Sequence, residues 1–408
     1  MSVSNVETAG KVQVYLPLAM DMTCPGCGAE RLWEFYTVRD VPVSSCVLMN
    51  SREEALDCGR GDVRLAYCEN CGFVSNTAFD AATQDFGAQY EGSQAASGVF
   101  NEFATSLARR LIDRYDIRHK SVLEIGCGRG KFLSLICRLG NNRGIGIDPA
   151  YTSGNGCEDG GGITFISDYY SSSYHNLSAD MICCRHTLEH ISEVREFLDM
   201  VRSGIRGRAG TVVFFEVPNA LRILRAGAFW DVYYEHCNYF TSETLRGLFV
   251  RAGFEIDEVY TDYGGQYLIL TARPSDAGDG SSGHSILGRE DVRRYVRKAE
   301  GRIRGWNTLL GQMRQGGKRV VTWGSSSNCV SFLTTVDESG SVEYVVDINP
   351  RKEGMYMAGA GHRIVGPEFL RKYRPEKVIV INPVYVDEIG KELERLGLEA
   401  ELLPITSV

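Results

Sequence analysis

Two pairs of cysteines near the start of the sequence have the spacing of metal ligands. Residues 24–27 read CPGC and residues 68–71 read CENC, and a glycine follows each pair. Four thiolates at this spacing suit tetrahedral zinc, and the glycines allow tight turns that direct backbone N–H groups at the sulfurs. Because four sulfurs close the coordination sphere, the predicted role is structural, with redox-active cysteines as the alternative. The predicted zinc ligands are Cys24, Cys27, Cys68 and Cys71.

A second chemical signature is the stretch SVLEIGCGRG (121–130), in which an apolar run ends in a glycine-rich turn. Such a turn lets a cofactor approach the backbone, and Asp148, at the end of the next apolar run, could bind both hydroxyls of a ribose. Glu124 precedes the first glycine by two residues, which is typical of enzymes that use S-adenosylmethionine (SAM). Lys131 stands where the NAD-binding fingerprint requires glycine. The pattern therefore favours SAM over NAD, and over an α/β core that binds no cofactor.

The segment RHTLEHI (185–191) follows another apolar run, at the place where SAM-dependent enzymes line the sulfonium and the substrate. His186 and His190 stand at positions i and i+4, and we expect them to share a helix face. The alternative is a helix start with two incidental histidines. Further residues predicted to contact the cofactor are Gly126, Cys127, Gly128, Ser167, Asp168, Arg185 and Gln94.

The stretch YYEHCNYF (233–240) combines aromatic side chains with a carboxylate and an imidazole. Histidine titrates near neutral pH and is the commonest general base, which makes His236 the candidate base. Glu235 beside it would orient the substrate or a neighbouring group, and Tyr233 could donate a hydrogen bond to a developing oxyanion. The alternative is a packed aromatic loop with one hydrogen-bonded histidine.

The rhythm of apolar stretches predicts the elements that position these residues. Between residues 120 and 270, apolar runs alternate with helical patterns, which indicates βαβ units and a mostly parallel sheet. A segment rich in glycine, serine and aspartate (274–285) and a basic helical stretch (289–313) precede three more apolar runs. We predict an α/β fold with a class I (Rossmann-like) SAM methyltransferase core, an N-terminal zinc-binding module and a smaller C-terminal α/β domain. The predicted limits are residues 1–88 for the zinc module, 89–275 for the SAM domain and 285–408 for the C-terminal domain.

Composition narrows the class of protein. The chain has 408 residues, of which 43% are hydrophobic, and a formal net charge of −8, which argues against nonspecific nucleic-acid binding. No apolar run is long enough to predict a membrane span. The 13 cysteines show no disulfide framework, and the N-terminal residues lack the features of a secretory signal, so we expect a cytoplasmic protein. The expected partner is a small molecule, and the expected state is a monomer or a weak homo-oligomer.

Taken together, the motifs resemble the SAM-dependent sugar C-methyltransferases of antibiotic deoxysugar pathways. The resemblance covers nearly the whole chain, in the same order. It is carried by CPGC and CENC, QYEGSQ (89–94), VLEIGCGRG, RHTLEHI, VPN (217–219), YYEHCNYF and VVDINPRKEGMYMAGAGHRIVGPEFL (345–370). That family has a four-cysteine zinc module, a central SAM domain and a C-terminal α/β domain, so the resemblance implies the same arrangement here.

The resemblance also implies a reaction, the methylation of a carbon next to the ketone of a nucleotide-linked 4-keto sugar. In the family a base removes the proton at C3, and the resulting enolate attacks the methyl group of SAM. The family's base is the histidine of its Y-x-E-H motif, which falls on His236, and the tyrosine and glutamate of that motif fall on Tyr233 and Glu235. A tyrosine that lies near the sugar falls on Tyr90.

The C-terminal region departs from the family pattern. Where the family often has Y-G-A-x-x-K-G-x-T, residues 323–332 read WGSSSNCVSF, and residues 355–363 lack the proline and threonine of the family's Y-x-P-G-T. A turn of small residues after a predicted strand still suits a phosphate or another small polar ligand. The nucleotide therefore stays open. Two other functions are an O- or N-methyltransferase of another small metabolite and a nonenzymatic zinc-containing interaction protein.

Overall fold

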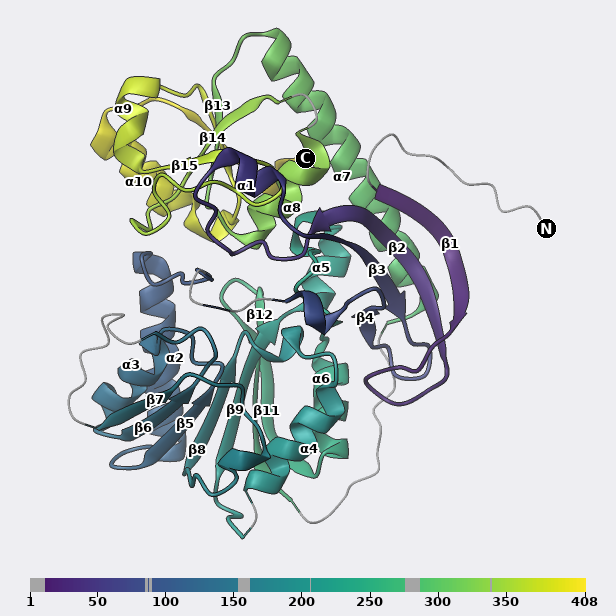
Figure 1. The fold of residues 1–408 in the computed structure, drawn as a ribbon, viewed down its shortest axis with the longest axis vertical. Helices are drawn as coiled ribbons and strands as arrows, with labels where there is room; N and C mark the ends of the chain where they lie inside the picture. Colours follow the sequence, from purple (N-terminus) through teal and green to yellow (C-terminus); the bar gives the residue numbers. More distant parts are fainter. Residues whose placement is uncertain are drawn as a thin grey trace.

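The computed structural model describes residues 12–84, 87, 90–152, 162–205, 207–275, 287–337 and 340–408, with residues 12–18 as backbone only. The chain forms three β-sheets, which Figure 1 shows as three neighbouring bodies. Most of the predicted glycine- and serine-rich segment lies outside the described residues. None of the helices in the described ranges combines the length and the apolar character that crossing a bilayer requires.

The N-terminal sheet is antiparallel and takes its last strand from a distant part of the chain. In spatial order its strands are β1 (Val12–Asp21), β2 (Arg31–Pro42), β3 (Arg60–Tyr67), β4 (Val74–Asn76) and β10 (Asn238–Tyr239). Its connections contain α1 (Arg52–Leu56) and the 3-10 turn η1 (Ala81–Thr83). Strand β10 follows His236 and pairs with β4 through Asn238 with Ser75 and Tyr239 with Val74. This sheet thus fixes the end of the YYEHCNYF stretch.

The central sheet has seven strands in the order β11-β12-β9-β8-β5-β6-β7. Its parallel strands are β5 (Ser121–Ile125), β6 (Arg143–Ile147), β7 (Ile163–Ile166), β8 (Met181–Arg185) and β9 (Val212–Pro218). The edge strands β12 (Tyr267–Pro274) and β11 (Phe254–Asp262) run antiparallel. Because helices cover both faces, β8 and β9 are almost continuously apolar and buried, which is why their runs could be recognised in the sequence.

Helices on the two faces of the central sheet build two separate cores. One face carries α2 (Gly98–Tyr115) and α3 (Lys131–Gly140), and the other carries α4 (Val194–Gly204) and α6 (Ser242–Arg251), as Figure 1 shows. The connections also contain α5 (Ala220–Ala226) and the 3-10 turns η2 (Ser172–Tyr174), η3 (Leu188–His190) and η4 (Phe229–Asp231). The parallel strands all end at one edge, which places the turns after β5, β6 and β8 side by side.

The C-terminal sheet is parallel throughout, in the order β15-β14-β13-β16-β17. Its strands are β13 (Val320–Trp323), β14 (Val342–Val346), β15 (Arg363–Val365), β16 (Lys377–Val380) and β17 (Glu401–Pro404). Its helices are α8 (Ser327–Val336), α9 (Leu370–Tyr373) and α10 (Val386–Leu396), with the 3-10 turns η5 (Pro367–Phe369), η6 (Pro383–Tyr385) and η7 (Ile405–Ser407). The predicted fold class, a class I core with a second α/β sheet, is confirmed.

One long helix joins the three parts. Helix α7 (Arg289–Gln315) is the predicted basic helical stretch, and its buried stripe includes Tyr295 and Trp306. These side chains belong to one apolar cluster with Tyr36 of β2, Trp230 of η4 and Phe332 of α8. The helix therefore packs against the N-terminal sheet, against the connection that follows β9, and against α8 of the C-terminal part.

Candidate active site

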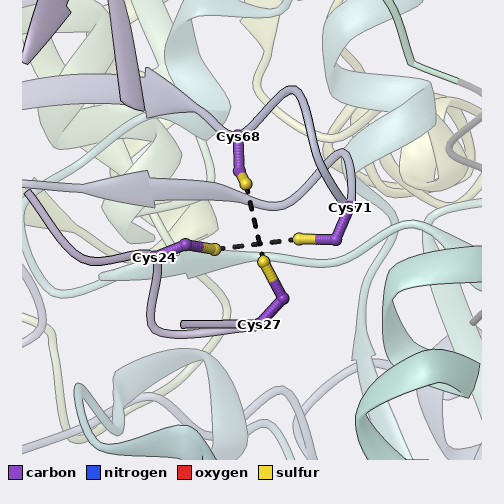
Figure 2. A group of neighbouring side chains, drawn as sticks. All are labelled: Cys24, Cys27, Cys68 and Cys71. Atoms are coloured by element: carbon purple, nitrogen blue, oxygen red, sulfur yellow. Dashed lines mark hydrogen bonds between the residues drawn. The ribbon is translucent and has the colours of Figure 1, made fainter. Parts of the chain in front are cut away.

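The four predicted cysteine ligands converge on one point. The sulfurs of Cys24 and Cys71 lie 3.7 Å apart, as do those of Cys27 and Cys68, and Figure 2 shows the four side chains pointing at a common centre. Four sulfurs around zinc at about 2.3 Å would lie about 3.8 Å from one another, so the cluster is compatible with a closed tetrahedral site. All four ligand atoms lie within 4.8 Å of each other.

The backbone of each knuckle supports this arrangement. Gly28 donates its N–H to the carbonyl of Cys24 at 2.9 Å, and Gly72 donates to that of Cys68 at 2.8 Å. Both glycines have positive φ values, +79° and +76°, as the tight turns require. The first knuckle also contacts the central part of the chain, because Arg251 of α6 donates to the carbonyl of Gly26 at 2.9 Å.

The predicted cofactor turn follows β5 and leads directly into α3. Gly126 and Gly128 have φ values of +71° and +52°, and a Cβ on Gly126 would lie 2.0 Å from the hydroxyl oxygen of Thr187. A Cβ on Gly128 would meet nothing within 4 Å, so open space lies beside this residue. Asp148 accepts the Gly128 N–H at 2.7 Å and thereby fixes the turn. The first turn of α3 offers the backbone N–H groups that favour a carboxylate or phosphate.

Two buried carboxyl groups beneath this turn differ in charge. Burial raises the pKa of Glu124 to about 8. Burial would also raise the pKa of Glu216, but Arg185 and His186 outweigh it and lower the value to about 2. Arg185 donates two hydrogen bonds to Glu216, at 3.1 and 3.0 Å, and its guanidinium lies 4.1 Å from the centre of the Phe132 ring. The structure thus places Arg185 in a structural ion pair.

The other predicted cofactor residues lie in different surroundings. Cys127 is buried within the glycine turn. Ser167 and Asp168 follow β7 and are exposed; Ser167 donates to the carbonyl of Pro149 at 3.4 Å, and Asp168 accepts from Tyr174 at 2.5 Å. Gln94 donates to the hydroxyl of Tyr267 at 3.1 Å and lines the cavity described next.

A cavity of about 380 Å³ lies where the three parts of the chain meet. The predicted residues in its wall are Tyr90, Gln94, His186, His190, Tyr233 and His236. Wall residues that sequence reasoning missed include Cys46, Glu189, Asp231, Ser325, Asp347 and Lys352. The glycine turn adjoins this cavity, since Gly126 packs against Thr187, the neighbour of His186.

His236 is buried among groups that keep it neutral. Its side chain is enclosed, and its Nε2 lies 3.0 Å from the hydroxyl of Tyr233. Burial lowers the pKa of His236 well below its ordinary value, and the nearby charge of His186 lowers it further. At neutral pH the imidazole therefore holds a lone pair, as a base requires. The hydroxyls of Tyr233 and Tyr90 stay protonated, because burial raises the pKa of each well above its ordinary value.

Glu235 is not among the residues that line the cavity, and it is held by Ser45, which the sequence did not reveal. Ser45 donates its N–H to the Glu235 carboxylate at 2.8 Å and its hydroxyl to the other carboxylate oxygen. Burial raises the pKa of Glu235, although the Ser45 hydrogen bonds act in the opposite direction. Cys46, the next residue, lies 3.1 Å from the hydroxyl of Ser327 in the C-terminal turn. The insertion between the cysteine pairs thus contributes to the site. No spacing pattern in the sequence predicted this contribution.

The expectation that His186 and His190 share a helix face is wrong. His186 has a φ of +48°, and only Leu188–His190 form a short 3-10 turn. His186 instead contacts Glu216, with 2.6 Å between Nε2 and Oε1. Burial opposes its charge, but Glu216 and Glu189 outweigh burial and raise its pKa to about 9. His186 is therefore a cation at neutral pH.

The segment that carries Tyr90 links the cofactor turn to the C-terminal sheet. Glu91 is buried and forms ion pairs with Arg129 of the glycine turn at 2.9 Å and with Arg351 at 3.4 Å. Gln94 accepts from the hydroxyl of Tyr385 at 2.8 Å. The cofactor turn and the C-terminal part are thus both bonded to the short segment that carries Tyr90.

The C-terminal wall of the cavity is a turn of serines fixed by an acid. Ser325 donates its N–H and its hydroxyl to Asp347, at 2.9 and 2.5 Å, and Lys352 lies 3.7 Å from the same carboxylate. Asn328, which stands where the family pattern has lysine, donates to Asp231 at 2.6 Å. Lys352 is buried in the wall, so it supplies a cation although the turn itself has none.

Comparison with known families matches two parts of the chain. Residues 96–259 match a family described as a methyltransferase domain. Residues 287–400 match a family described as a C-methyltransferase C-terminal domain. The C-methyltransferase NovU of Streptomyces niveus is 24% identical over 288 residues, which cover 66% of this chain and 67% of NovU.

Solved structures match less than half of the chain. An O-methyltransferase family protein of Burkholderia thailandensis gives a TM-score of 0.34 at 19% identity, over 44% of this chain and 59% of that protein. The 1,6-didemethyltoxoflavin-N1-methyltransferase of the same organism, with S-adenosylhomocysteine bound, gives 0.34 at 18% identity, over 43% of this chain and 80% of that enzyme.

Proposed function

Because the chain is a SAM-dependent methyltransferase that carries the C-terminal domain of the C-methyltransferase family, we propose that it methylates a carbon atom of a nucleotide-activated keto sugar. The observation that carries this proposal is a neutral, buried histidine, His236, in a cavity next to the cofactor turn. Carbon becomes a nucleophile only after it loses a proton. An acceptor that is already nucleophilic needs no such base.

The residues of this chain suit each step of that reaction. A ring nitrogen of His236 takes the proton from the carbon beside the ketone. The electron pair of the broken C–H bond forms an enolate, whose oxygen accepts a hydrogen bond from the protonated hydroxyl of Tyr233 or Tyr90. The bound cofactor would supply the methyl group. The enolate carbon forms the new C–C bond as the S–CH3 bond breaks, and the electron pair of that bond stays on sulfur, so that S-adenosylhomocysteine leaves. Glu235, clamped by Ser45, holds the loop that carries His236.

The same geometry supports the remaining assignments. We propose that the glycine turn holds the amino-acid end of SAM and that Asp148 binds its ribose. The C-terminal wall, with the Ser325 turn and the buried Lys352, would hold the activating group of the substrate. The four cysteines would bind one structural zinc ion that docks the N-terminal sheet on α6. A small-molecule enzyme of this kind fits a cytoplasmic location.

Isotope exchange tests the proposed base without turnover. With unmethylated sugar and S-adenosylhomocysteine in D2O, we expect the wild type to wash deuterium into the acidic carbon and the His236→Asn variant to fail. General base catalysis is worth roughly 10²–10⁴-fold, so kcat should fall by about that factor while SAM affinity barely changes. His119→Asn is a matched control, since His119 is exposed and outside the cavity wall. Exchange at the wild-type rate in His236→Asn would exclude His236 as the base.

A further inference from the structure

Three side chains in the cavity wall have the composition and spacing of a metal site apart from the four cysteines. Glu189, His190 and His236 each offer a ligand atom, and these atoms lie within 4.8 Å of one another. Two imidazoles and one carboxylate are the donors that zinc, cobalt and nickel ions prefer. Three protein ligands also leave a coordination position open toward the cavity, unlike four sulfurs.

The buried carboxylate of Glu189 has an oxygen that is unsatisfied within the described part of the chain. Glu189 is 1% exposed, and its Oε2 has no hydrogen-bond partner among the residues that the structure describes. Its other oxygen, Oε1, lies 3.6 Å from the His186 ring, so Oε2 is the oxygen left for an ion. A buried carboxylate oxygen without a partner is destabilising, and a cation at this point would satisfy it.

The two imidazoles are held in a way that suits ligation. The Nδ1 of His190 lies 2.9 Å from the backbone carbonyl of Glu235. A carbonyl only accepts, so Nδ1 is the donor, and Nε2 is the ring nitrogen left to bind an ion. Metal-binding histidines commonly donate their second N–H to a carbonyl or carboxylate in this manner. The Nε2 of His236 lies 3.0 Å from the hydroxyl of Tyr233, so this imidazole is held in place as well.

Hydrogen bonds of the surrounding segments fix the relative positions of the three ligands. Cys237 donates its N–H to the carbonyl of Glu189 at 2.9 Å, and Asn238 donates its side-chain amide to the carbonyl of Ile191 at 2.6 Å. Two hydrogen bonds therefore connect the turn that carries Glu189 and His190 to the loop that carries His236. A site whose ligands are held in advance loses little entropy when an ion binds.

We propose that Glu189, His190 and His236 bind one divalent transition-metal ion, and that the bound ion blocks methyl transfer by occupying the lone pair of His236. The blocking step rests on the proposed role of His236 as the base. The binding step does not, because it depends only on the three ligands.

Cobalt(II) is the probe for the binding step. Co²⁺ is added to the full chain whose cysteine site is already filled with zinc, as confirmed by elemental analysis. We expect one further equivalent of Co²⁺ to bind, with the visible d–d bands of nitrogen and oxygen ligands and without the near-ultraviolet band of thiolate–cobalt charge transfer. That missing band separates this site from the four cysteines and from Cys46.

Variants assign the ligands. Glu189→Gln and His190→Asn should each weaken Co²⁺ binding by more than about tenfold, since even the loss of an outer partner of a metal ligand costs roughly 10–100-fold. The control His119→Asn should bind Co²⁺ as the wild type does. A thiolate band, no second equivalent of Co²⁺, or unchanged binding in both variants would overturn the site.

The blocking step is measured by deuterium exchange at saturating Co²⁺. Exchange in the wild type should fall to the level of His236→Asn and recover when a chelator removes Co²⁺ but leaves the cysteine-bound zinc. Unchanged exchange would overturn the blocking step alone. Faster exchange would overturn both the blocking step and the assignment of His236 as the base, while the Co²⁺ spectrum would still report on the site.

Discussion

The central and the C-terminal sheets place an aspartate at the same topological position. Asp148 follows β6 and accepts from the N–H of Gly128 at 2.7 Å, and Asp347 follows β14 and accepts from the N–H of Ser325 at 2.9 Å. Each acid also accepts from the backbone of the second residue after it, at 2.7 and 2.8 Å. In both sheets, therefore, the acid after the second strand fixes the turn that follows the first.

The two acids differ in their electrostatic surroundings. Burial raises the pKa of Asp148, and its contacts within the described part of the chain are backbone N–H groups. Burial acts on Asp347 in the same direction, but Lys352 and Ser325 outweigh it and lower the pKa. Among the described residues, the same topology thus yields one acid with no cationic partner, suited to the hydroxyls of a cofactor. The other acid is already paired with a lysine and is suited to shaping the cavity wall.

The largest expected effect comes from breaking the pair that distinguishes the two sheets. Lys352→Met leaves the Asp347 carboxylate, whose side chain is 11% exposed, without its cation. Removal of one partner of a fully buried ion pair costs about 3–5 kcal/mol, which is the upper limit here. We expect a clear fall in thermal unfolding temperature, measured by scanning calorimetry. Lys372→Met, on the exposed side of α9, is the matched control.

A double variant sharpens this result. Replacing both partners, as in Lys352→Met with Asp347→Leu, should recover much of the lost stability, since no uncompensated charge remains. If Lys352→Met unfolds at the wild-type temperature, the proposed electrostatic difference between the two sheets is wrong.

The next effect concerns the unpaired acid. Asp148→Ala removes a charged acceptor of ribose hydroxyls, and each such hydrogen bond is worth roughly 1.5–3 kcal/mol. SAM affinity, measured by calorimetry, should fall by about tenfold or more, at about 1.4 kcal/mol per decade. The Lys352→Met protein should keep wild-type SAM affinity below its unfolding temperature. Equal affinities in Asp148→Ala and the wild type would contradict the assignment of Asp148.

The N-terminal sheet contributes to the site in a third way, by holding an acid that belongs to another part of the chain. Ser45→Ala removes the hydroxyl that donates to Glu235. Because the Ser45 hydrogen bonds lower the pKa of Glu235, the variant should raise it, so the acidic limb of the kcat profile should move to higher pH. We expect kcat to fall by about tenfold, the equivalent of one hydrogen bond to a charged group, with SAM affinity unchanged. The neighbouring Ser44→Ala should leave both unchanged; a profile that does not move in Ser45→Ala would refute the clamp.

The sequence predicted those features that depend on local pattern. Strands such as β8 and β9 were visible because a parallel sheet buries both of their faces. The four cysteines and the glycine turn were visible because their chemistry demands fixed residue types at short spacing. The contact of Ser45 with Glu235 spans 190 positions of the chain, and nothing in the spacing of either segment encodes it. The pairing of β10 with β4 was missed for the same reason.

The histidines of RHTLEHI show how tertiary contacts override a local pattern. An i, i+4 spacing implies a shared face only if the segment is helical. Thr187 packs against Gly126, and His186 reaches Glu216, so the chain adopts a positive φ at His186 in place of a helical turn. Both contacts come from segments that the heptapeptide itself cannot reveal.

The smallest expected effect is a pH dependence of stability that only the central sheet should show at alkaline pH. The pKa of Glu216 is lowered to about 2, so its contribution is present above its ordinary value of 4.5 and is lost as pH falls toward 2. The pKa of His186 is raised to about 9, so its contribution is complete below 6.5 and is lost as pH rises through 9. Unfolding temperature should therefore be highest between these limits.

His186→Gln should flatten the decline in unfolding temperature between about pH 7 and 9.5. It should leave the acid side largely unchanged, since Arg185 still pairs with Glu216 and does not titrate in this range. Lys352→Met should keep the alkaline decline, because its pair lies in the other sheet. An alkaline decline that persists in His186→Gln would place its origin elsewhere and remove His186 from the electrostatic difference between the two sheets.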